Sequence, residues 1–423
     1  MATDIKDTLH PVDPEAIMRL LGTRPRLLAL GEPTHGAETL LGLRNELFRQ
    51  LVEREGYRTI ALEVDCLGGL LVDDYITRAG DPDLGLDEVM ERGFSHEWGA
   101  FPGNRELVRW MRAHNEGLPA PDRVRFAGFD GPLEITGGAS PRPVLTALHE
   151  YLSARVDADL LPCTAEALDR MIGADARWTD PDAMLDPSRS VGQSAEAREL
   201  RLLADDLVAL LDAQAPHLIA TSSPEAWERV RLFGRTATGL LRYHFWLADT
   251  SPGRMTWLLG VRDAMMAANL HALAERAPTL AYGHNSHLQR SPSEMTMWGH
   301  PRLEWWGAGA LVSARAGAGY GFLATALGTI PEHGVGAPAP DTVEGMLYAQ
   351  LQEAQLQEAP LDETLLDEIL PRAGAVVDAP RLAAALGAPP PARVSPWYGY
   401  APLSPAHLAK ADGIVFVKDV LQR

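Results

Sequence analysis

Acidic and histidine side chains follow two apolar segments in the first part of the chain. Glu32 and His35 lie in the turn LGEPTHG, directly after the first apolar run, and Glu63 ends the next one. In a parallel α/β sheet, the turns that follow the strands line the crevice where ligands bind. The three side chains should therefore converge if the two strands are neighbours. A histidine held by a carboxylate is suited to general acid and base chemistry near neutral pH.

Arg44 adds a positive charge to this group. It falls in line with apolar residues at helical spacing, on a helix expected to begin near residues 37–39. The guanidinium should point toward the sheet, where a buried charge needs a partner, and Glu32 or Glu63 would serve. Taken singly, these residues are more simply explained as a structural ion pair and a turn histidine. Taken together, they favour a functional site.

A later segment repeats the pattern of charged residues on an apolar stripe followed by a strand end. Arg262 and Asn269 interrupt the apolar face of a predicted helix, and His284 and His287 follow the strand predicted over residues 279–282. That strand should end at the same edge of the sheet as the first group. The HxxH spacing alone is a weak signal, because the HExxH pattern of zinc proteases is absent and either histidine could simply cap a turn.

Both segments resemble the erythromycin esterase family. The family's mark is a GE-x-THG turn, then a helix, then a strand that ends in an ALE-like glutamate, and this chain has GEPTHG followed by LRNELFRQLVEREGYRTIALE. The patterns RDxxMAxN and HNxH follow in the family's order, although Ala268 stands where an acid is expected. The resemblance extends over about residues 28–417 and is poor in the middle. It implies functional roles for Glu32, His35, Arg44, Glu63, His284 and His287.

Weaker features add further candidates. Asp130 ends a predicted strand at the same edge, where the family has a similar G-x-D, and it would either orient a histidine or cap a turn. His96 and Trp98 lie in a segment similar to one in the family and are expected to line the pocket. Cys66, just past Glu63, is a minor candidate nucleophile. No G-x-S-x-G elbow occurs, so the usual serine hydrolase route has no support.

The composition excludes several classes of protein. With 423 residues and a charge of −19, the chain should repel nucleic acids and anionic membrane surfaces. Its two cysteines supply neither a disulfide framework nor a cysteine-rich zinc site. Neither a signal peptide nor a run approaching the ~20 apolar residues of a membrane span is evident. We expect a cytoplasmic protein that acts on a small molecule, with its oligomeric state left open.

The pattern of apolar residues along the chain indicates an α/β fold. Apolar runs typical of buried strands alternate with helical patterns, which predicts a mostly parallel sheet flanked by helices. The middle of the chain is different, because residues 143–250 show long helical periodicity and read as a helical insertion or cap. Residues 1–142 and 251–423 would then form the two parts of one catalytic domain. The strands are expected at residues 26–31, 59–64, 124–129, 279–282, 322–327 and 414–417.

Without a serine elbow, an esterase of this kind must activate water directly. We therefore expect hydrolysis of an ester or lactone, and the resemblance points to a macrolide or another secondary metabolite, with antibiotic resistance as a consequence. His284 is the expected general base, and His35, held by Glu63 or Glu32, is the second acid/base group. Arg44 would hold the carboxylates or stabilise the oxyanion. The expected substrate-binding residues are His287, Arg262, Asn269, Asp130, His96 and Trp98.

Three alternatives remain open at this point. The same histidines and glutamates would serve a non-hydrolytic enzyme of secondary metabolism that performs dehydration, elimination or cyclisation. No cofactor is expected, but a divalent metal is possible, because Glu32, His35, Glu63, His284 and His287 could form a carboxylate/histidine site. A binding protein without turnover is disfavoured, since binding alone does not require paired acid/base groups.

Overall fold

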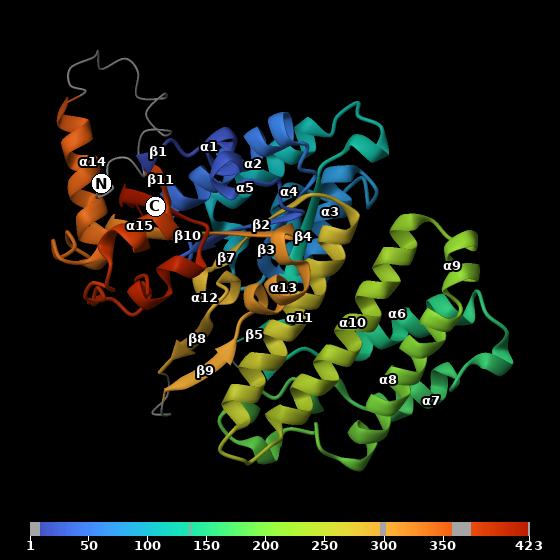
Figure 1. Ribbon diagram of the computed structural model, residues 1–423. Coiled ribbons are helices and arrows are strands. Elements are labelled where there is room, and N and C mark those ends of the chain that lie inside the picture. The colour runs from blue at the N-terminus through green and yellow to red at the C-terminus, as the bar shows by residue number, and fades with distance from the viewer. Residues whose placement is uncertain (1–8, 135–136, 297–301, 358–373, 422–423) are drawn as a thin grey trace.

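A central sheet of eight strands organises the protein (Figure 1). The computed structural model describes residues 9–134, 137–296, 302–357 and 374–421. Across the sheet the strands run in the order β1 (Leu9–His10), β11 (Gly374–Asp378), β12 (Gly413–Asp419), β10 (Tyr320–Thr329), β2 (Leu27–Glu32), β7 (Thr279–His284), β3 (Thr59–Asp65) and β4 (Arg125–Asp130). From β12 to β4 all neighbours are parallel, and β1 and β11 add an antiparallel edge.

The mostly parallel sheet and each of its six predicted strands are confirmed. The predicted boundaries are close to those observed, but β10 begins at Tyr320 and extends to Thr329. The strand β11 was not predicted, because its apolar core is the three-residue run Ala375–Val377, too short to stand out in the sequence.

Helices cover both faces of the sheet, and the alternation along β2 shows why. Leu28 and Leu30 belong to the core under one helical layer, and Leu27 and Ala29 belong to the core under the other. Successive side chains of a strand point to opposite faces, so a strand buried on both sides is apolar throughout. The first layer contains α1 (Pro14–Leu21), α2 (Glu38–Glu55), α3 (Cys66–Thr77), α4 (Leu86–Gly93) and α5 (Pro102–His114). The second contains α11 (Arg254–Arg276), α13 (Ala308–Ala316), α14 (Val343–Gln357) and α15 (Ala379–Leu386).

The middle of the chain is helical, as predicted, and packs around a hydrophobic cluster to which Met255, Leu258 and Met265 from a later helix also contribute. Its long helices form the green lobe beside the sheet in Figure 1. The Ser194 hydroxyl caps the helix α8 (Ala195–Ala213) by accepting the N–H of Ala197. The helices are α6 (Arg142–Ser153), α7 (Ala165–Ile172), α8 (Ala195–Ala213), α9 (Ala215–Thr221) and α10 (Pro224–Leu247). The division into domains at residues 142/143 and 250/251 stays a prediction.

A helix must be both long and apolar to cross a bilayer. Within residues 9–134, 137–296, 302–357 and 374–421, none is long and apolar enough to cross a bilayer.

Candidate active site

The carboxyl edge of the sheet brings the predicted acid and histidine residues together. β2 and β3 are not adjacent as the sequence argument required, because β7 lies between them and pairs with both. The register places Glu32 opposite His284. Glu63 accepts the main-chain N–H of His284 at 2.7 Å through Oε2. The two glutamates therefore lie on either side of the end of β7 and are not direct neighbours.

Close packing fixes the turn that follows β7. Asn285 begins the short helix α12 (Asn285–Leu288), and its side-chain amide donates to the carbonyl of Thr325 and accepts the N–H of Thr325. A Cβ added at Gly31 would lie 2.1 Å from Oδ1 of Asn285, so only glycine fits at this point of β2. The ends of β2 and β7 are thereby locked to the middle of β10, next to Glu32 and His284.

Glu32 and His35 form a carboxylate–imidazole pair at the boundary with solvent. Nδ1 of His35 lies 2.8 Å from Oε1 of Glu32, while Oε2 of Glu32 accepts the hydroxyl of Tyr282. The Glu32 side chain is 2% exposed and that of His35 is 38% exposed. Burial lowers the pKa of His35, but the hydrogen bond and charge of Glu32, with the charge of Glu63, outweigh it and raise that pKa above the ordinary value.

Glu63 is the centre of a buried ionic cluster. Its Oε1 lies 3.3 Å from Nε2 of His287 and 3.4 Å from a guanidinium nitrogen of Arg262. Burial alone would raise the pKa of Glu63, but the charges of His287, His35 and Arg262 lower it to about 2. The carboxylate is therefore ionised at neutral pH.

His287 is held between two carboxylates. Its Nδ1 lies 2.9 Å from Oδ1 of Asp263, opposite the contact of Nε2 with Glu63. Burial lowers the pKa of His287, whereas the charges of Asp263 and Glu63 raise it to about 9. At neutral pH the ring is an imidazolium that donates to Asp263 and forms an ion pair with Glu63.

Asp263 was missed by the sequence argument. It is fully buried and also accepts the indole N–H of Trp305 and the main-chain N–H of Ala308, each at 2.7 Å. Asp263 directly follows Arg262 in the RDxxMAxN pattern, and this position could have identified it as a candidate.

His284, the expected general base, caps the turn in this structure. Its Nδ1 accepts the N–H of Ser286 at 3.2 Å and lies 2.7 Å from the hydroxyl of Ser286. The ring also forms a hydrogen bond with the main chain of Pro33. Burial, followed by the charge of His35, lowers the pKa of His284 to about 3, so the ring is neutral. Its centroid lies 5.2 Å from that of His35, so the two rings face each other across the site.

Arg44 points toward the sheet as predicted, and it is 1% exposed. The prediction that it pairs with Glu32 or Glu63 is wrong. Its guanidinium donates to the side-chain oxygens of Asn45 and Asn104, and it lies over the Tyr282 ring, 4.9 Å from the centroid. Tyr282 is the group that reaches Glu32, through its hydroxyl. Arg44 thus supports the site through Tyr282.

The predicted substrate-binding residues separate into two groups. Arg262 binds both oxygens of Asp130, with its shortest contact at 2.6 Å, and its side chain is 26% exposed. The Trp98 ring lies 4.7 Å from the His35 ring and 5.3 Å from that of His96. These four residues lie around the acid/base groups.

Asn269 lies elsewhere. Its amide donates to the carbonyl of Phe129 and accepts from Nε of Arg235, on the wall of a different cavity.

Two of the alternative chemistries can be compared with the geometry. Among the described residues, no three His, Cys, Asp or Glu side chains form a group that could hold a metal ion. Burial raises the pKa of Cys66 to about 12, and its thiol lies against the hydroxyl of Thr236. A protonated, buried thiol is a poor nucleophile.

Comparison with known proteins identifies relatives. A protein-family model described as erythromycin esterase matches residues 52–420. Erythromycin esterase type II of Escherichia coli is 23% identical over 278 residues, which cover 63% of this chain and 61% of that protein. The alignment therefore spans less than two thirds of that relative's length.

Solved structures share the fold. A protein from Bacillus cereus superposes with a TM-score of 0.69 at 18% identity, over 99% of this chain and 96% of that one. A succinoglycan biosynthesis protein gives a TM-score of 0.62 at 15% identity, over 99% and 96% of the two chains. A mutant of the erythromycin esterase EreC, in its open conformation, gives a TM-score of 0.62 at 17% identity, over 96% and 93%. At these identities the likeness concerns the fold.

Proposed function

From the premise that this chain belongs to the erythromycin esterase family, we propose that it hydrolyses an ester or lactone with water activated by His35. The observation that carries the proposal is the contact between buried Glu32 and half-exposed His35. A carboxylate at Nδ1 fixes the tautomer of an imidazole and supports the proton that the ring receives at Nε2.

The proposed reaction needs no covalent enzyme intermediate. His35 accepts a proton from water while the water oxygen bonds to the carbonyl carbon, which gives a tetrahedral oxyanion. When the carbon–oxygen bond to the leaving group breaks, the alkoxide takes the proton from His35. The products are an acid and an alcohol, and His35 is neutral again. A positioned acid/base group of this kind contributes about 10²–10⁴-fold to a rate.

We assign the base to His35 instead of His284. Nδ1 of His284 is engaged with Ser286, and its ring is bound to the main chain of Pro33, so it is suited to shaping the wall opposite His35. Of the two arginines near the acids, Arg262 is 26% exposed and is the one that can approach a substrate oxyanion. Arg44 is too deeply buried for that role.

The proposed substrate class is a lactone or ester of a secondary metabolite, such as a macrolide. The support is the family membership and the name of the Escherichia coli relative, an erythromycin esterase. Dehydration, elimination and cyclisation on the same groups are the less favoured alternative. If macrolides are the substrate, the protein would confer resistance to them.

Product mass tests the proposal. Purified protein is incubated with macrolide lactones and with simpler lactones and esters, and the expected product is heavier by one water. The gain should disappear in His35→Ala and persist in His217→Ala, a histidine exposed on α9. Treatment with a chelator should leave the gain unchanged. A gain that persists in His35→Ala would refute the assignment of the base, and loss of water or an isobaric product would support the non-hydrolytic alternative.

A further inference from the structure

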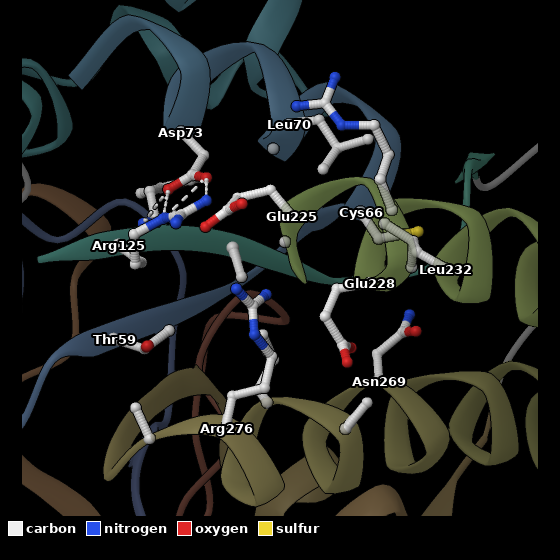
Figure 2. A pocket seen from close by; sticks show the side chains of 18 of the residues that line it. Thr59, Cys66, Leu70, Asp73, Arg125, Glu225, Glu228, Leu232, Asn269 and Arg276 are labelled. Atoms are coloured by element: carbon white, nitrogen blue, oxygen red, sulfur yellow. Dashed lines mark hydrogen bonds and ion pairs between the residues drawn. The ribbon is translucent and has the colours of Figure 1, made fainter. Parts of the chain in front are cut away.

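A cavity of about 280 Å³ lies along β4, the edge strand of the sheet, where α3, α10 and α11 surround it (Figure 2). Its lining does not include the acid or histidine residues of the candidate active site. The cavity is therefore distinct from the candidate active site, and the proposed hydrolysis does not require it.

Arginines outnumber the acids in the lining of this cavity. Six arginines and three acids line it, in a chain whose overall charge is −19. An excess of positive charge gathered against the general balance of the protein attracts anions. The arginines are Arg58, Arg123, Arg125, Arg229, Arg235 and Arg276, and the acids are Asp73, Glu225 and Glu228.

The acids are engaged with arginines on the rim. Asp73 binds Arg125, as the dashed lines in Figure 2 show, and the charge of Glu225 also acts on Arg125. Glu228 pairs with Arg231 at 3.3 Å. A further acid outside the lining, Asp74, pairs with Arg229. Among the described residues, none of these four acids forms an ion pair with Arg58, Arg123, Arg235 or Arg276.

Two further lining arginines, Arg58 and Arg123, donate to main-chain carbonyls. This leaves Arg235 and Arg276 to bind a ligand. Within the described residues, neither has a carboxylate at ion-pair distance, and the hydrogen bond of Arg235 goes to the neutral amide of Asn269 at 3.3 Å. Burial, then the charge of Arg231, lowers the pKa of Arg235. Figure 2 shows Arg276 extending from α11 toward the middle of the cavity. For Arg235, which is partly buried, a cation without a counter-ion is costly unless something else neutralises it.

This position also explains Asn269, which interrupts the apolar stripe of α11 but lies outside the active site. By donating to the Phe129 carbonyl it is fixed to the end of β4, and by accepting from Nε of Arg235 it holds that side chain in the cavity. The planar guanidinium keeps its other N–H groups for a second acceptor.

We propose that this cavity binds a small molecule through an oxyanion group, a carboxylate or a phosphate, with Arg235 and Arg276 as its ligands. Guanidinium groups bind both kinds of oxyanion in a bidentate manner. The cavity is at the small end of the range for ligand pockets, roughly 300–1,000 Å³, which suits a compact anion.

Calorimetric titration of the full chain tests this proposal, with sodium phosphate in one arm and sodium citrate in the other. Sodium chloride at matched ionic strength controls for screening. Binding of either anion is the expected result, and the arm that binds identifies the preferred oxyanion. Arg235→Gln and Arg276→Gln should each weaken binding by about tenfold or more, because each removes a charge-assisted contact.

Arg381→Gln is the matched control, since Arg381 is an exposed arginine on α15, outside the lining of the cavity. It should bind the anion as the unaltered chain does. Arg276 is itself exposed, so its variant is expected to fold normally. The proposal is overturned if neither anion binds beyond the chloride control, or if binding persists undiminished in both Arg235→Gln and Arg276→Gln.

Discussion

Nδ1 of His35 and Oε1 of Glu32 lie 2.8 Å apart, with the carboxylate 2% exposed and the imidazole 38% exposed. The turn after β2 thus places a buried carboxylate, that of Glu32, next to a partly exposed imidazole, that of His35. The carboxylate is itself held from behind by the hydroxyl of Tyr282. A fixed acid behind an accessible imidazole is the arrangement that general-base chemistry requires.

Replacement of His35 by alanine should remove the activity and leave the fold intact. The ring is partly exposed, so its loss creates no core cavity, whereas loss of a general base costs about 10²–10⁴-fold in rate. Steady-state kinetics and thermal unfolding of His35→Ala, with His217→Ala as control, measure the two effects. An active His35→Ala would show that another group activates the water.

Replacement of Glu32 by glutamine should move the pH profile. Glu32 raises the pKa of His35, and a general base works only when neutral, so activity should rise as pH increases through that pKa. Glu32→Gln removes the charge, lowers the pKa of His35 and shifts the acidic limb of kcat/KM to lower pH. The exposed acid Glu15 supplies the control variant Glu15→Gln. An unmoved limb in Glu32→Gln would mean that the limb reports a different group.

His287 should make stability depend on alkaline pH. Its pKa is raised to about 9 in the folded protein, above the unfolded value of about 6.5. The stabilisation is therefore complete below pH ~6.5 and is lost as pH rises through about 9, on the order of 3 kcal/mol in all.

Urea unfolding of the unaltered chain and of His287→Gln, at pH 6 and pH 10, isolates this contribution. The difference in unfolding free energy between the two proteins should shrink at the higher pH. A difference that is independent of pH would show that His287 is neutral when folded.

Arg44→Ala should destabilise the protein by roughly 2–4 kcal/mol. The substitution leaves a core cavity and removes the donors to the side-chain oxygens of Asn45 and Asn104. Arg54→Ala, an exposed position on the same helix, should change the unfolding free energy by less than about 0.5 kcal/mol. Equal stability of the two variants, measured by urea unfolding, would contradict a structural role for Arg44.

Local rules predicted which residues reach the carboxyl edge of the sheet. Glu32, Glu63 and His284 each follow an apolar run, and the ends of parallel strands meet at one edge whatever the strand order. The helical stripe likewise predicted that Arg44 is buried. These features depend on short-range periodicity, which the sequence displays directly.

The partner of each side chain depends on the order of the strands in the sheet, which these local rules do not predict. Because β7 separates β2 from β3, Tyr282 occupies the place between Arg44 and Glu32, and nothing local to either residue indicates this. Along α11, Arg262 and Asn269 share a face, yet seven residues of helix span about 10 Å. That distance is enough to bring one side chain to the active site and the other to a separate cavity.

The position of β7 also determines when the site can form during synthesis. Glu63 and the main-chain N–H of His284 that it binds are separated by 221 positions in sequence. At about 5–20 residues per second, the ribosome needs on the order of 10–40 seconds to add that length. Until then β2 and β3 have open edges where β7 will insert, the kind of surface that invites mispairing. Nascent chains that end before residue 279 therefore lack the candidate active site, and its assembly waits until the helices α6 to α11 have been made.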